Sequence, residues 1–132
     1  MGQNPRTEGE IPLEDPVQNT ACPVQLRLKE NTLTAWLCGE IDHHTARKIR
    51  EAVDETASRV RPERLILDFS AVQFMDSSGI GLIMGRCKLL AAWNGRVIVR
   101  HVPPKLERIV SLSGLQRLCY VEEGGPRHET GQ

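Results

Sequence analysis

The chain has 132 residues, the size of one ordinary domain, and 39% of them are hydrophobic although only 4% are aromatic. Lysine plus arginine equals aspartate plus glutamate at 17 each, so the sequence lacks the positive charge that nucleic-acid binding normally requires. The most apolar stretch is interrupted by Arg86 and Lys88, and residues 1–21 hold no apolar core of a secretory signal. We therefore expect a cytoplasmic protein that binds neither nucleic acid nor membrane.

Residues 1–21 contain three prolines and no periodic apolar pattern that could join a core, so we expect a disordered extension. Residues 124–132 have the same character and are expected to form a flexible tail. A single domain should therefore span residues 22–123. Apolar and polar residues alternate over Val24–Leu28 and again over Leu33–Leu37, which predicts a β-hairpin with one buried face.

The next segment predicts a helix with one apolar stripe, capped by Asp42 or Thr45 and stopped by Pro62. The apolar run Leu65–Phe69 predicts a central strand covered on both faces, with helices above and below the sheet. A loop over Phe74–Asp76 should follow it. The expected residues of the stripe are Ala46, Ile49, Val53 and Ala57.

A second helix is expected over Ser77–Trp93, and a strand over Arg96–Val102. Pro103-Pro104 should open a third helix that Gly114 closes, and Leu118–Val121 should form an edge strand. The element order is therefore β-β-α-β-α-β-α-β. It predicts an α/β fold in which a mixed sheet of four or five strands is flanked by helices.

The segment Asp76-Ser77-Ser78-Gly79-Ile80 lies where the chain enters a helix. Unpaired N–H groups and the helix dipole favour negative charge there, so a serine in this turn can carry a phosphate without melting the helix. The residues alone favour a simpler role, because serines are common N-caps and short motifs often mislead.

Catalytic and metal sites fit the sequence poorly. The glycines from Gly79 onward match neither a dinucleotide fingerprint nor a P-loop, and a hydrolase elbow needs a glycine two residues before its serine. His43 and His44 are adjacent and point in different directions, and the four cysteines are widely scattered. We expect no enzyme, no cofactor and no metal.

Three blocks resemble a known family: Gly39–Ala46, Phe74–Gly81 and Gly85–Lys88. They are similar to the bacterial anti-sigma factor antagonists of the STAS domain class, most of all to sporulation-type members that act on the sigma-F anti-sigma factor. The resemblance spans approximately Val24–Val121 and leaves out both ends of the chain. The long amino-terminal extension departs from the compact family pattern.

The resemblance implies a partner-switching cycle. The unphosphorylated antagonist binds an anti-sigma factor that is also a serine kinase, and so frees the sigma factor. Phosphorylation at the first serine after the motif aspartate, here Ser77, ends the binding, and a serine phosphatase resets the protein. Carried over residue by residue, the partner-binding positions are Asp42, His43, Asp76, Ser77, Ser78, Gly79 and Ile80.

Other hypotheses remain open at this point. A general-stress antagonist or a scaffold protein of the same class would share much of the pattern, whereas a small enzyme with a nucleophilic serine lacks the elbow and a base placed near Ser77. No strongly apolar stripe is left exposed once the helices are placed on the sheet, so we expect a monomer when the chain is free.

Overall fold

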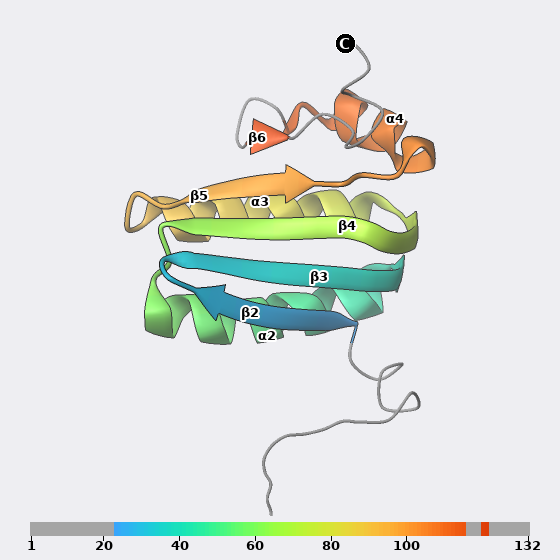
Figure 1. Ribbon diagram of the computed structural model, residues 1–132. Helices are drawn as coiled ribbons and strands as arrows, with labels where there is room; N and C mark the ends of the chain where they lie inside the picture. The colour runs from blue at the N-terminus through green and yellow to red at the C-terminus, as the bar shows by residue number, and fades with distance from the viewer. Residues whose placement is uncertain (1–22, 116–119, 122–132) are drawn as a thin grey trace, which may run out of the picture.

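A five-stranded mixed sheet in the order β2-β3-β4-β5-β6 forms the centre of the structure (Figure 1). The structure, a computed structural model, describes residues 23–115 and 120–121, so the predicted extension 1–21 and tail 124–132 lie outside it. Strand β2 runs antiparallel to β3, and the other neighbouring strands are parallel. The elements are β2 (Val24–Lys29), β3 (Thr32–Ile41), α2 (His43–Val60), β4 (Arg64–Met75), α3 (Ser77–Ala91), β5 (Arg96–Arg100), α4 (Pro104–Ser113) and β6 (Tyr120–Val121).

The amino-terminal hairpin forms as the alternation predicts. Val24 pairs with Leu37, and the turn is made possible by Glu30, which adopts the left-handed backbone conformation at φ 58°. The predicted apolar face of the hairpin is only partly buried: Leu28 is 47% exposed, whereas its partner Leu33 is fully buried. At the turn end of the hairpin, β3 therefore contributes to the core more than β2 does.

Both long helices pack on the same face of the sheet. Helix α2 contacts β3 and α3 contacts β4 and β5, while the two helices also contact each other behind the strands (Figure 1). The expectation of helices above and below the sheet is therefore wrong. The opposite face is made of residues such as Thr34, Trp36 and Ile66, which are half-buried, and neither α2 nor α3 covers it. The predicted stripe of α2 is confirmed: the buried residues of this helix are Ala46, Ile49, Val53 and Ala57.

Strand β4 is much longer than its apolar run suggests. Its first residues, Arg64–Asp68, pair with β5, whereas its pairing with β3 continues through two register shifts as far as Met75. Phe74 and Met75 therefore belong to the strand and not to the loop that the sequence predicts. Backbone pairing with β3 extends the strand past the point where the apolar pattern ends.

The remaining boundaries shift by a few residues. Helix α3 ends at Ala91, two residues before the predicted end, because the chain turns through Asn94 with φ 62°. Strand β5 ends at Arg100, before the predicted Val102. Helix α4 and its closure by Gly114 in the left-handed conformation are confirmed. No helix within residues 23–115 combines the length and the apolar character needed to cross a membrane.

A buried carboxylate ties β4 to the end of β5. The side chain of Asp68 is 2% exposed, and its Oδ1 accepts hydrogen bonds from the amide and hydroxyl of Ser70 at 2.9 and 2.7 Å. Its Oδ2 accepts a bond from Arg100 Nε at 3.1 Å and lies 3.0 Å from His101 Nδ1. Burial alone raises the pKa of Asp68, but these hydrogen bonds outweigh it and hold the pKa below its ordinary value.

We predict that Asp68→Asn lowers the free energy of unfolding by about 2–3 kcal/mol at pH 7, because it leaves charged and polar donors without their anion. Since the folded pKa is depressed, the carboxylate stabilises the fold above about pH 4, and this contribution is lost as the pH falls further. Urea unfolding should therefore show a smaller difference in the free energy of unfolding between the wild type and Asp68→Asn at pH 3 than at pH 7. Glu55→Gln, at an exposed position of α2, is the control and should change stability by less than about 0.5 kcal/mol.

Candidate functional site

The parallel pairing of β3 and β4 brings two helix entrances together at one edge of the sheet. Ile41 is the register partner of Met75, so both strands end side by side. The amide of Asp76 donates a hydrogen bond of 3.1 Å to the carbonyl of Ile41, which fixes one loop to the other. Asp42 and Asp76, the residues that follow the two strands, therefore start α2 and α3 at the same edge.

Asp42 and Thr45 close the first turn of α2 together. The amide of Thr45 donates to Asp42 Oδ1 at 3.0 Å, and the amide of Asp42 donates to Thr45 Oγ1 at 2.9 Å. This capping box makes Asp42 the N-cap and places Thr45 three residues inside the helix, so the two alternatives from the sequence are both used. The amide of Thr45 lowers the pKa of Asp42, which keeps a negative charge at the exposed edge.

Asp76 is the N-cap of α3, and its side chain binds the amide of Ser78, not the adjacent Ser77. Its Oδ1 accepts a hydrogen bond of 2.8 Å from the amide of Ser78. Ser77 is the first residue of the helix and is exposed, whereas Ser78 is half-buried. The hydroxyl of Ser77 is therefore presented to solvent at the positive end of the helix dipole, directly after the N-cap residue Asp76.

Gly79 and Ile80 support this turn from beneath. Gly79 is buried, and a Cβ atom at this position would lie 2.2 Å from Cγ and 2.3 Å from Sδ of Met75. Ile80 is 8% exposed and belongs to the core. The two residues that the family pattern places on the recognition surface thus offer almost no side chain to a partner. Their close packing on β4 instead fixes the position of the helix turn that carries the exposed Ser77.

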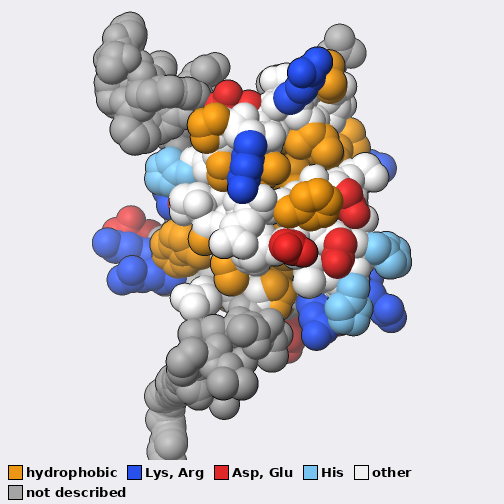
Figure 2. All heavy atoms as spheres, turned by 90° about the vertical axis from the view of Figure 1, so that its right-hand side faces the viewer, with side chains coloured by type: hydrophobic (Ala, Val, Ile, Leu, Met, Phe, Trp, Pro, Cys, Tyr) orange, Lys and Arg blue, Asp and Glu red, His pale blue; other side chains and the backbone are white. Residues whose placement is uncertain are grey.

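The face at the carboxyl ends of β3 and β4 is mixed in character. Figure 2 looks onto it and shows acidic side chains beside hydrophobic ones near the middle, with histidines toward both sides. Asp42 and His43 are exposed there, and Asp76 is half-buried. Among the described residues, no group of three or more histidine, cysteine or acidic side chains is arranged to hold a metal ion.

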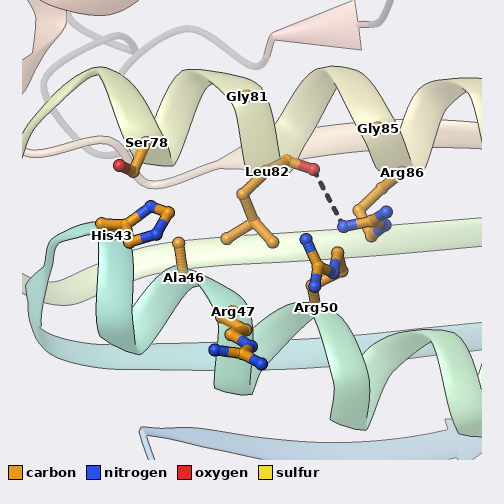
Figure 3. Close-up of a pocket in the computed structure, with 9 residues that line it drawn as sticks. All are labelled: His43, Ala46, Arg47, Arg50, Ser78, Gly81, Leu82, Gly85 and Arg86. Atoms are coloured by element: carbon orange, nitrogen blue, oxygen red, sulfur yellow. Dashed lines mark hydrogen bonds between the residues drawn. The ribbon is translucent and has the colours of Figure 1, made fainter.

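A groove of about 680 Å³ runs between α2 and α3, next to this face (Figure 3). Of the predicted site residues, His43 and Ser78 line it. The groove also holds a buried cation that the sequence pattern did not predict as a site residue: Arg86, whose Nε lies 2.9 Å from Asp54 Oδ1. An arginine within the apolar pattern of α3 was the available signal. The full lining is His43, Ala46, Arg47, Arg50, Ser78, Gly81, Leu82, Gly85 and Arg86.

The sequence model of the STAS domain matches residues 24–124, which is nearly the whole described part of the chain. The chain belongs to the STAS domain family. This family membership agrees with the resemblance seen in the three sequence blocks, and with the observed order of strands and helices.

STAS proteins with assigned roles are similar to it in sequence and in structure. An anti-sigma F factor antagonist from Paenibacillus polymyxa is 37% identical over 95 residues, which cover 72% of this chain and 81% of the relative. The unphosphorylated form of the anti-sigma factor antagonist SpoIIAA has a TM-score of 0.67 at 30% identity, covering 81% of this chain and 94% of SpoIIAA. The phosphorylated form of SpoIIAA, a Bacillus cell fate determinant, has a TM-score of 0.61 at 29% identity, with 83% and 99% covered.

Two glycines of α3 provide a matched test of how the site is supported. We predict that Gly79→Ala lowers the free energy of unfolding by about 1–3 kcal/mol, because the new methyl group overlaps the side chain of Met75. Gly81→Ala should instead stabilise the helix by about 0.5–1 kcal/mol, since nothing lies within 4 Å of its new methyl group. Urea unfolding of both variants measures the two effects. Equal changes in the two variants would contradict the contact between Gly79 and Met75.

Proposed function

We propose that this STAS protein is an anti-sigma factor antagonist whose unphosphorylated form binds an anti-sigma factor with serine kinase activity. Binding releases a sigma factor of the sigma-F type, and phosphorylation of Ser77 ends it. The observation that carries the proposal is the exposed Ser77 at the first position of α3, directly after the helix-capping residue Asp76. The similarity to named antagonists supports the choice of partner.

Because Ser77 lies at the start of α3, a phosphate on it can weaken partner binding without unfolding the helix. A phosphoserine adds about −1.5 to −2 charges, and the amino end of a helix favours such an anion by roughly 0.3–1 kcal/mol. The side chain of Asp76 accepts a hydrogen bond from the amide of Ser78, so the dianion enters a turn that already holds a negative charge. A partner that had docked against a neutral hydroxyl would then meet a dianion next to the carboxylate of Asp76.

The geometry favours Ser77 over Ser78 as the phosphate acceptor. Ser77 is exposed, whereas Ser78 is half-buried and lines the groove beside His43. A kinase has to surround the hydroxyl that it phosphorylates, so the exposed serine is the better substrate. Asp42, His43 and Asp76 are proposed to contact the partner around it, while Gly79 and Ile80 position the turn from below.

The acidic edge also suggests how the encounter begins. Asp42 keeps its charge because the amide of Thr45 lowers its pKa, and Asp76 lies on the neighbouring loop. Complementary charges on a partner increase the rate of association more than the final affinity. We further propose that a serine phosphatase restores the binding form, that the cycle runs in the cytoplasm, and that this chain is a protein substrate and not an enzyme.

We predict that Ser77→Ala gains no phosphate when incubated with ATP and the anti-sigma factor kinase of the same genome, because the acceptor oxygen is gone. Ser78→Ala, which keeps that oxygen, is the matched control and should gain one phosphate. Intact-mass spectrometry measures both. Ser77→Asp should bind the kinase more weakly than Ser77→Ala, since it carries part of the phosphate charge. Phosphate on Ser77→Ala at the normal rate would contradict the assignment.

A further inference from the structure

The aromatic side chain of Phe74 lies exposed at the same edge of the sheet as Ser77. Phe74 is 50% exposed, although it belongs to the central strand β4. The other large hydrophobic side chains with comparable exposure among the described residues are Leu28 and Leu112. Phe74 is the one that lies two positions before the helix cap Asp76. A single exposed hydrophobic residue is ordinary in itself. What distinguishes Phe74 is its place at the end of β4, directly before the turn that carries Ser77.

The exposure of Phe74 follows from the topology of the sheet. Its neighbour Met75 is buried and packs under Gly79, and successive residues of a strand point to opposite faces. Phe74 therefore points to the face that α2 and α3 leave uncovered. Strand β5 pairs with β4 only as far as Asp68, so in the described part of the chain this neighbouring strand does not reach Phe74.

The ring is surrounded by acidic positions. Glu40 is its register partner on β3 and is exposed, and Asp42 and Asp76 follow on the two loops. Figure 2 shows the same combination on this face, with hydrophobic surface directly beside acidic side chains. An apolar centre with a polar rim is the usual composition of a protein–protein contact, and a few residues at the centre, often aromatic, supply most of the affinity.

We propose that Phe74 is an anchor residue for the anti-sigma factor, inserted into an apolar pocket of that partner whose border carries basic side chains. This inference rests on the proposed function and extends it to a residue outside the phosphorylated turn. Ser77 and Phe74 would then be covered by one partner at the same time. The phosphate on Ser77 would loosen a contact whose affinity comes largely from the ring.

A second copy of the chain fits this surface less well. Two copies that met through Phe74 would bring Glu40, Asp42 and Asp76 of one copy near the same acidic residues of the other. Like charges facing each other across an interface oppose association. Charge complementarity therefore favours a basic partner over self-association.

The test compares two single variants with the wild-type chain. Phe74→Ala removes the proposed anchor, and Leu28→Ala is the matched control, because Leu28 is 47% exposed but pairs with Leu33 near the opposite end of β3. Binding to the purified anti-sigma factor kinase of the same genome is measured by surface plasmon resonance without ATP. We expect the Kd of Phe74→Ala to rise by about tenfold or more and that of Leu28→Ala to stay within about twofold.

Each other outcome overturns a definite part of the account. If the wild type binds and Phe74→Ala binds equally well, the anchor is wrong and the proposed function stands. If the wild type does not bind the kinase at all, the proposed function fails together with the anchor. Phe74→Leu, which keeps apolar volume, should give an intermediate Kd, and circular dichroism shows whether each variant is folded. A change in the oligomeric state of free Phe74→Ala, with partner affinity unchanged, would identify a self-association surface instead.

Discussion

The parallel register between β3 and β4 is the constraint on which the site depends. It sets Ile41 against Met75, and the hydrogen bond from the amide of Asp76 to the carbonyl of Ile41 locks the two strand ends together. Two helices therefore begin at one edge, each with an aspartate as its N-cap. A slip of this register would separate Asp42 from Asp76 and remove the face between them.

Close packing in the core supports the exposed edge from below. Met75 fills the space under Gly79, which lets the first turn of α3 lie close to the sheet. Asp68 holds the carboxyl end of β5 through its hydrogen bond with Arg100. The site thus combines a rigid base with an exposed hydroxyl, and chemistry at that hydroxyl need not disturb the packing.

Much of the fold could be predicted because its signals are local: the apolar stripe of α2 and the limits Pro104 and Gly114 of α4 are visible in the sequence. The length of β4 and the one-sided covering of the sheet depend on pairing between distant segments, which periodicity does not record. The position of Ser77 at a helix start was predicted from its neighbours. The exposure of Phe74 was not, because it depends on which face the neighbouring elements cover.

The central claim is that a phosphate on Ser77 changes what the surface binds and leaves the helix beneath it intact. Amide hydrogen exchange of the first two turns of α3, compared between the phosphorylated and unphosphorylated chain, tests it most directly. The account predicts that protection of these amides is kept or slightly increased, because the dianion lies at the positive end of the helix. Loss of protection throughout these turns would show that phosphorylation works by unfolding the helix, and would contradict the account.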